Sequence, residues 1–292
     1  MATATGSTNF GATYDHISQL GGATVSGAIP SIRGFAIEPN LFGIATGATL
    51  CIFVAKYFTF DRRKTVRMGI ALLSVALLLS YTRSAFIGLV MAVLAMAITS
   101  NKWRAIFSTI QVALLAVVAL IAVLFFLPND NAFKQTVSYK FGSGIVDFSE
   151  GTSIPRMVAF EESLKGFSKN PFIGNGIFSA NNVFINPHTG EVTGTAGPIG
   201  WLNGLFIQAL HDTGLIGVIL WLTFFCLLLI RNFNTYKRLP PSLEKSIVRG
   251  FLGGNIVIFI GSQASSVVWI SFPYIFWGLN LVLLRNFSNT LT

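Results

Sequence analysis

Residues 151–176 read GTSIPRMVAFEESLKGFSKNPFIGNG, and they lie in the only long polar interval between the apolar segments of the chain. The pattern predicts one helix, which Thr152 or Ser153 can cap. Its apolar residues recur at helical spacing and form one stripe, which comprises Met157, Phe160, Leu164 and Phe167. Asn170 and Pro171 then end the helix, because a proline disfavours helical backbone in the residue before it. A short helix is therefore expected outside the apolar segments.

Arg156 falls in the first turn of this expected helix. Free N–H groups already make a helix N-terminus positive, so a cation there is unfavourable unless an anion lies nearby. The residue is thus a candidate for binding phosphate. A pairing of Arg156 with Glu161 or Glu162, or simple solvation, is an equally good interpretation of this pattern alone.

The composition indicates an integral membrane protein. Hydrophobic residues make up 52% of the 292 residues and charged residues only 11%, whereas soluble domains carry about 25% charged residues. The net charge of +9 does not indicate nucleic-acid binding, because the basic residues form short clusters between apolar runs. Cys51 and Cys226 lie inside apolar runs, so neither a disulfide nor a metal site is expected.

The apolar runs predict an all-α, polytopic fold with about seven transmembrane helices and one large extracytoplasmic loop that contains the short helix. The expected spans are residues 41–58, 66–80, 86–99, 105–127, a run ending at 230, 251–261 and 267–284. We treat the chain as a single membrane domain. Its parts are an outer N-terminal segment at 1–40, four spans within 41–127, the loop at 128–200, and three spans with a cytoplasmic tail at 201–292.

Alternation of the spans places 13 of the 20 basic residues on one side, and this side is then cytoplasmic. The N-terminal segment and the long loop accordingly face outward. Residues 1–32 lack the basic and apolar regions of a signal peptide. Because a polar tail rarely crosses a membrane without a preceding helix, we expect further spans upstream of this chain.

Three arginines lie on the outward side at the edges of the expected membrane: Arg33, Arg83 and Arg156. The turn that carries Arg83 is so short that its side chain must stay close to the bilayer. Guanidinium groups bind phosphate oxygens in bidentate fashion and keep their charge, which suits a lipid-linked diphosphate. Snorkelling to ordinary lipid phosphates is the alternative for each arginine taken singly.

The stretch NGLFIQALHDTGLIG begins at Asn203 and leads into the fifth expected span. His211 is a possible general base and Asp212 a possible local partner, although a histidine that merely bonds a neighbouring carbonyl is more common. Gly214 and Gly217 are expected to permit close helix packing. No metal or cofactor is expected, because neither His16 nor His188 has a partner at ligand spacing.

Four stretches together resemble the O-antigen ligase/O-antigen polymerase family of bacterial membrane glycosyltransferases. They are RGFAIEPNLFG, LLLSYTRSAFIGL, PRMVAFEESLKGFSKNPFIGNG and NGLFIQALHDTGLIG, and they fall in that order within about residues 31–230. Each motif is weak alone, whereas the four in order around a long outward loop are fairly specific.

The resemblance implies transfer of a glycan from an undecaprenyl-diphosphate donor to a sugar hydroxyl, on the outer face of the bacterial inner membrane. The acceptor would be lipid A-core for a ligase or another lipid-linked glycan for a polymerase. By the same resemblance, Arg33, Arg83 and Arg156 would neutralise the diphosphate leaving group without a metal. The chain would contact membrane lipids and no nucleic acid.

One position departs from the family pattern. The motif that leads into the fifth span usually begins His-Asn, and this chain has Asn203 followed by Gly204. Asparagine can orient an acceptor hydroxyl but cannot take its proton at neutral pH. Either His211 or Asp212 supplies the base, or the step needs none in this branch, or the chain is inactive. The departure weakens a ligase assignment more than a polymerase assignment.

Two other function classes fit part of the pattern. A transporter of lipid-linked glycan or of a small anion could use the same outward arginines, but the spans contain few ionisable residues and no repeated pair of interrupted helices. A non-catalytic family fragment would explain Asn203 and the low number of spans.

Overall fold

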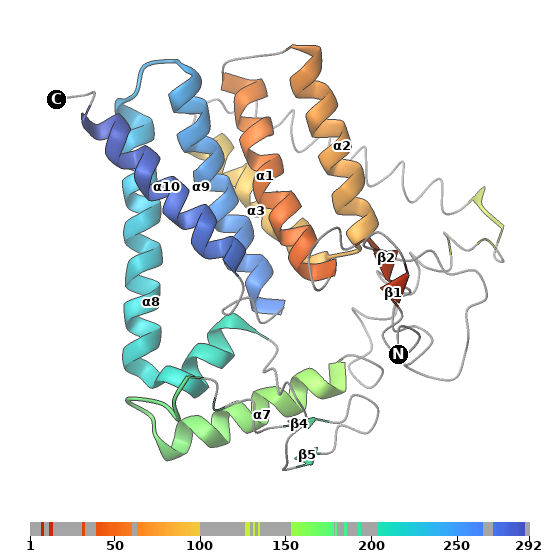
Figure 1. The fold of residues 1–292 in the computed structure, drawn as a ribbon, viewed down its shortest axis with the longest axis vertical. Helices are drawn as coiled ribbons and strands as arrows, with labels where there is room; N and C mark the ends of the chain where they lie inside the picture. The colour runs from red at the N-terminus through yellow and green to blue at the C-terminus, as the bar shows by residue number, and fades with distance from the viewer. Residues whose placement is uncertain are drawn as a thin grey trace.

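The computed structural model describes residues 7–8, 12–13, 31–32, 39–59, 63–99, 126–128, 131, 134, 153–177, 179, 184–185, 192–193, 204–264 and 271–289. Within these residues, long helices lie side by side as one bundle and a separate helix lies across one of its ends (Figure 1). The predicted helical architecture is therefore confirmed for the described residues.

Six of the described helices coincide with expected apolar runs. They are α1 (Pro39–Thr59), α2 (Lys64–Ser80), α3 (Arg83–Thr99), α8 (Leu205–Arg238), α9 (Leu243–Gly261) and α10 (Ser271–Asn289). Two helices extend past their runs at one end of the bundle, because α8 continues through Arg238 and α9 begins at Leu243. The polar residues there complete helical turns and need not cross lipid.

Two described helices are long and apolar enough to span a membrane, Asn40–Thr59 and Leu205–Arg238, and Arg83–Thr99 is a shorter apolar helix. The expected fourth span, residues 105–127, lies outside the described residues except at its end. The topology with seven spans therefore stays a prediction.

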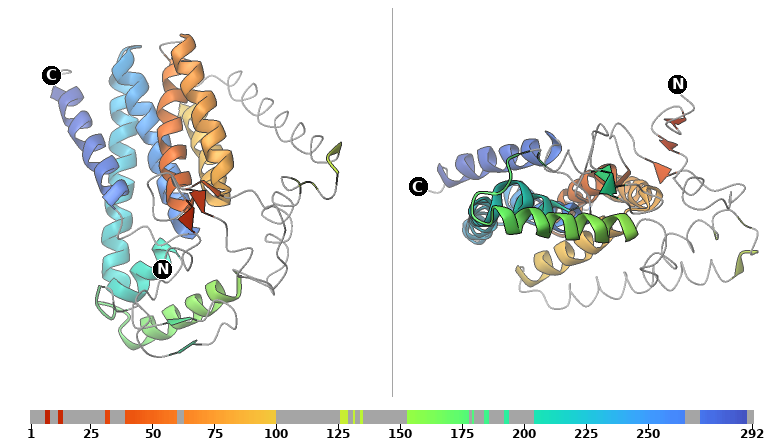
Figure 2. Two further views of the ribbon diagram at one scale, coloured as in Figure 1. Left: turned by 45° about the vertical axis from the view of Figure 1, so that its right-hand side comes forward. Right: turned by 90° about the horizontal axis from the view of Figure 1, so that it is seen from below.

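The helix expected in the long loop is α7 (Ser153–Lys169), and it ends directly before Asn170-Pro171 as predicted. Two views show α7 crossing the end of the bundle at which α1 begins, from α8 toward α1 and α2 (Figures 1 and 2). We call this end the loop end and the opposite one the basic end. Two-residue strands form two small antiparallel sheets, β1 (Ser7–Thr8), β2 (Ala12–Thr13) and β3 (Ser31–Ile32) in one, and β4 (Phe184–Ile185) and β5 (Val192–Thr193) in the other.

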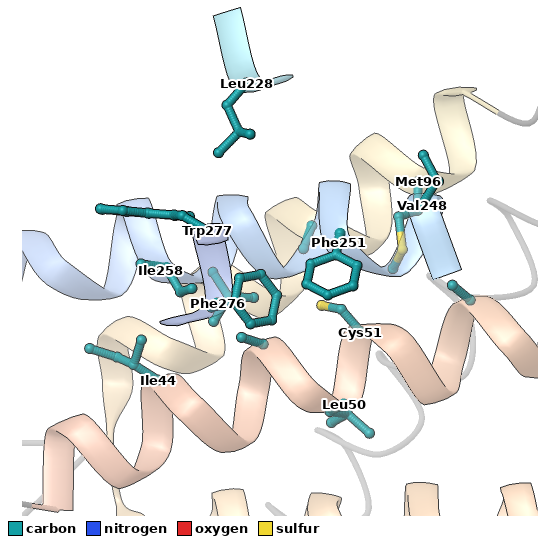
Figure 3. Packing of buried hydrophobic residues seen from close by; sticks show 14 of the residues in the cluster. Ile44, Leu50, Cys51, Met96, Leu228, Val248, Phe251, Ile258, Phe276 and Trp277 are labelled. Atoms are coloured by element: carbon teal, nitrogen blue, oxygen red, sulfur yellow. The ribbon is translucent and has the colours of Figure 1, made fainter. Parts of the chain in front are cut away.

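Helix α9 is the centre of the bundle, since it contacts α1, α3, α8 and α10. Figure 3 shows the apolar core, in which residues of α1, α3, α9 and α10 pack together. Close packing of α3 on α9 depends on Gly88, because a Cβ atom there would lie 3.0 Å from Val257 Cα. Small residues that let helix backbones approach are typical of helix contacts in membranes.

At the basic end, Arg249 of α9 holds the ends of two other helices. Its Nε donates to the Met96 carbonyl at 3.1 Å, its Nη2 donates to the same carbonyl, and its Nη1 donates to Thr59 Oγ1 at 3.1 Å. Met96 belongs to the last turn of α3, whose carbonyls lack helical partners, and Thr59 is the last residue of α1. A buried cation is favourable here because helix C-termini are negative.

Replacing Arg249 by lysine should lower the free energy of unfolding by about 2 kcal/mol, because one ammonium group cannot bond both helix ends and a charge-assisted hydrogen bond contributes about 1.5–3 kcal/mol. Thermal unfolding in detergent measures the effect. Lys237→Arg is the matched control, since Lys237 is exposed at the same end. Equal stability of Arg249→Lys and the control would contradict the structural role of the guanidinium group.

Candidate functional site

The start of α1 lies against the turn between α2 and α3. A Cβ atom at Gly43 would lie 2.4 Å from Thr82 Oγ1 and 2.7 Å from Ser80 Oγ. The buried Thr82 caps α3, because its carbonyl accepts the N–H groups of Ala85 and Phe86 at 3.2 Å each. The motifs RGFAIEPNLFG and LLLSYTRSAFIGL therefore meet at the loop end.

Arg83 is the first residue of α3 and is partly buried. Arg156 lies in the first turn of α7, and its side chain is not among the described ones. Both arginines are thus in first turns, where free N–H groups add positive potential. Arg33 lies outside the described residues, but β3 ends at Ile32 and contacts α1 and α2.

Helix α8 is interrupted at Gly214, which has φ 60° and ψ −162°. We call residues 211–216 the helix break. In a continuous helix the carbonyls of His211 and Asp212 would accept the N–H groups of Leu215 and Ile216. At the break these four groups are free to bond another segment.

The segment that bonds them is residues 170–177, NPFIGNGI, which we call the inserted turn. Four backbone hydrogen bonds join the two segments: Asn175 N–H to the His211 carbonyl at 3.0 Å, Gly176 N–H to the Asp212 carbonyl at 3.0 Å, Leu215 N–H to the Pro171 carbonyl at 2.9 Å, and Ile216 N–H to the Phe172 carbonyl at 3.1 Å. Asn175 Nδ2 adds a bond to the His211 carbonyl at 3.1 Å. The inserted turn thus satisfies the groups that the break frees, and the third and fourth motifs meet here.

Two glycines make this backbone contact possible. Gly174 has φ +72°, and a Cβ atom there would lie 2.5 Å from the Asp212 carbonyl group. A Cβ atom at Gly214 would lie 2.6 Å from Gly174 N. Gly214 was expected to permit close packing between helices; it instead admits a turn and breaks its own helix. Gly217 lies instead beside its own helix neighbour Thr213.

His211 and Asp212 form a buried polar pair directly at the break. His211 Nδ1 lies 2.8 Å from Asp212 Oδ1. Ser179 Oγ donates to the same carboxylate oxygen at 3.3 Å, and Gln208 Nε2 donates to Asp212 Oδ2 at 3.5 Å. Both members of the pair are at most 5% exposed. The carboxylate is therefore held in place by donors from two segments.

The imidazole of His211 lies against α7. A Cβ atom at Gly166 would come within 2.5 Å of His211 Nε2. The buried Ser163 donates from Oγ to the Ile207 carbonyl at 2.8 Å and fixes α7 to the first part of α8. Helix α7 thus covers one face of the pair.

The short helix η5 (Ser262–Ala264) connects the two groups of motifs. Gln263 Oε1 accepts the Phe206 N–H at 3.3 Å, and a Cβ atom at Gly204 would lie 3.0 Å from the Gln263 carbonyl oxygen. The same short helix contacts α3, which Arg83 begins. The described parts of all four motifs therefore lie at the loop end. Asn203, which precedes Gly204, is outside the described residues.

A groove of 560 Å³ runs between α8 and α10. Its polar side chains are at the loop end and include Gln208, Asp212 and Ser262. Its remaining lining is mostly apolar and aromatic, and includes Trp221 and Trp277. Among the described residues, no three His, Cys, Asp or Glu side chains form a group that could hold a metal ion. The groove suits a long apolar ligand with a polar end.

Sequence reasoning missed several residues around the pair and at the start of α8. Gln208 precedes Asp212 by one helical turn, and this spacing was visible in the sequence. Ser179 follows the inserted turn and Gln263 belongs to η5. Both lie far from α8 in the sequence, so no local pattern pointed to them. The groove between α8 and α10 likewise depends on packing.

A family model described as O-Antigen ligase matches residues 68–222, which is more than half of the chain. The match includes the Arg83 turn, α7, the inserted turn and the helix break. A comparison with curated proteins gives no match.

Replacing Gly174 by alanine should lower the free energy of unfolding by at least about 3 kcal/mol, because left-handed strain of about 1–2 kcal/mol is joined by a clash with the Asp212 backbone. Gly176→Ala is the matched control, since Gly176 has φ +98° but open space around its Cβ position. Chemical unfolding of both variants measures the difference. Equal losses would show that the inserted turn does not contact the break.

Proposed function

The chain belongs to the O-antigen ligase family, and from this premise we propose that it transfers glycan from an undecaprenyl-diphosphate donor to a sugar hydroxyl. The family is membrane-associated and of glycosyltransferase type, and the chain has apolar helices to match. The proposed product is a lengthened polysaccharide or a glycan joined to lipid A-core. The observation that carries the proposal is the meeting of all four motifs at one end of the bundle.

We assign the donor diphosphate to Arg33, Arg83 and Arg156. Support comes from the helix starts, since Arg83 begins α3 and Arg156 lies in the first turn of α7. A guanidinium group next to free helical N–H groups is a favourable partner for phosphate. Negative charge grows on the diphosphate as the glycosidic bond breaks, so fixed cations stabilise the transition state without a metal.

The lipid part of the donor would lie in the groove between α8 and α10. An isoprenoid chain is long, flexible and apolar, and the aromatic lining of the groove offers contact area for it. The polar side chains of the groove lie at the loop end, where the diphosphate would be. This arrangement would present the reacting bond to the site at the helix break.

For the acceptor side we propose Asn203, His211 and Asp212. Asp212 lines the groove, and its carboxylate is oriented by His211, Gln208 and Ser179. The acceptor hydroxyl would give its proton to this pair while its oxygen bonds the sugar carbon that leaves the diphosphate. Asn203 would orient the hydroxyl. The family usually has a histidine where this chain has Asn203. In this chain His211 and Asp212 would act as the base in place of that histidine.

We further propose a multi-pass topology of seven spans in the bacterial plasma membrane, with the loop end extracytoplasmic. In the bundle helices, exposed basic residues gather at the basic end: Lys64, Arg67, Arg231, Lys237 and Arg238. At the loop end, the only basic residues that α7 exposes among its described side chains are Lys165 and Lys169. This distribution follows the tendency of lysine and arginine to remain in the cytoplasm. The active face would then be outside.

An assay with purified protein in lipid tests the reaction. An undecaprenyl-diphosphate oligosaccharide is supplied with and without lipid A-core, and products are separated on a gel. Lengthened glycan without core identifies a polymerase, and transfer that needs core identifies a ligase. Flux of labelled donor across liposomes without any product would contradict the proposal and favour a transporter.

Variants of the site should separate the assigned roles in the same assay. Arg83→Ala, Arg156→Ala and Asp212→Asn should each lower the rate by about 100-fold, because one transition-state donor or one catalytic base contributes at least that much. Arg156→Lys should keep only part of the rate that Arg156→Ala loses, because lysine cannot bind phosphate in the bidentate manner of arginine. Arg67→Ala, exposed at the basic end, should keep full activity. Unchanged glycan from Arg83→Ala and Arg156→Ala would refute the diphosphate site.

A further inference from the structure

The inserted turn presents large apolar side chains to the outside. Phe172 is 65% exposed, Ile173 73% and Ile177 62%. These three residues flank the glycines that contact the helix break. The turn thus binds α8 through its backbone and the Asn175 side chain, and its apolar side chains point away. Such a group of exposed apolar side chains needs an apolar partner.

The exposed side chains continue the outer surface of α8. The backbone pairing places Phe172 beside Ile216, which is 50% exposed, and the exposed Ile219 and Leu220 follow along the helix. This row belongs to one of the two described helices that are long and apolar enough to cross a membrane. The turn therefore extends a surface that lipid would cover.

The length of α8 gives the depth of the turn. The exposed Arg231 marks where the helix leaves the hydrocarbon layer at the basic end. A hydrocarbon layer of about 30 Å corresponds to about 20 helical residues. The uninterrupted part of α8 reaches from Arg231 back to the break at Gly214, which at 1.5 Å per residue is about 25 Å. The paired turn therefore lies near the outer edge of the hydrocarbon.

The polar groups of the turn are compatible with this depth. Gly174 N–H donates to the Asn170 carbonyl at 2.9 Å, and the N–H groups of Asn175 and Gly176 donate to α8. The carbonyls of Pro171 and Phe172 accept from α8. Irregular backbone is tolerated near lipid only when its polar groups are satisfied by protein.

Helix α7, which precedes the turn, also exposes apolar side chains. Phe160 and Leu164 are exposed on it, and the exposed Lys169 ends it. Helical spacing puts Phe160 and Leu164 on one face of α7 and Lys169 on the opposite face. An exposed apolar face opposite a basic residue is typical of helices at the level of lipid headgroups.

We propose that the inserted turn is a membrane anchor: Phe172 and Ile173 enter the outer leaflet of the phospholipid bilayer and hold the helix break at headgroup depth. The anchor rests on the orientation proposed above. Its consequence is that the site is kept level with the diphosphate of a lipid-linked donor, whose own depth the membrane sets.

Site-directed spin labelling of the full chain in phospholipid nanodiscs tests the anchor. Single cysteines replace Phe172 or Ile173 in a background with Cys51→Ala and Cys226→Ser. Arg238→Cys, exposed beyond Arg231 at the basic end, is the aqueous control, and Ile219→Cys, exposed on α8 outside the groove, is the lipid control. Collision of each label with oxygen, which concentrates in lipid, is compared with collision with a water-soluble nickel chelate. Thermal unfolding confirms that each labelled variant is folded.

The ratio of oxygen to nickel accessibility should be at least about threefold higher at residues 172 and 173 than at 238, and should approach the ratio at 219. A ratio equal to that at 238 would show that the turn lies in water. Exclusion of both reagents would show that protein covers it. Either result overturns the anchor.

The measurement needs no substrate, so it separates the anchor from the proposed reaction. A lipid-exposed turn in a chain that makes no glycan would refute the reaction alone. A water-exposed turn in an active chain would refute the anchor alone.

Discussion

Backbone hydrogen bonds between the inserted turn and the helix break are the constraint on which the site depends. A helix interrupted near a membrane leaves two carbonyls and two N–H groups that must find partners, and each unsatisfied group is costly in an apolar setting. The inserted turn supplies all four partners in one contact. Because Gly174 and Gly214 bring the two backbones together, the turn, α7 and both parts of α8 are fixed relative to one another.

This contact explains how a buried carboxylate comes to line a groove of apolar character. The break directs the first part of α8 across the loop end, where Asp212 receives donors from His211, Gln208 and Ser179. The second part of α8 continues toward the basic end and forms the aromatic wall of the groove with α10. Helix α8 thus contributes both to a polar site and to the apolar groove, and a lipid-linked sugar donor requires both.

Much of the fold followed from the sequence, because apolar runs and capping patterns are local. The bounds of α7 were predictable for this reason. The start of α3 was not, since Arg83 was expected in a turn before a span at 86–99 and is instead the first residue of the helix. The break at Gly214 was not, since the residues around it have a helical pattern and their bonds go to a turn far away in the chain. Of the site, His211 and Asp212 were identified as neighbours, whereas Ser179 depends on tertiary contact. Arg33 and Asn203 remain predictions outside the described residues.

Hydrogen exchange at single backbone amides tests the contact most directly. If the turn is inserted, the amides of Asn175 and Gly176 exchange as slowly as those of Leu215 and Ile216, and all four become fast together in Gly174→Ala, because the four bonds form one cooperative unit. Protected amides at Leu215 and Ile216 beside rapidly exchanging Asn175 and Gly176 would contradict this structure. That result would show that α8 is continuous and that the N–H groups of Leu215 and Ile216 donate to carbonyls of α8 itself.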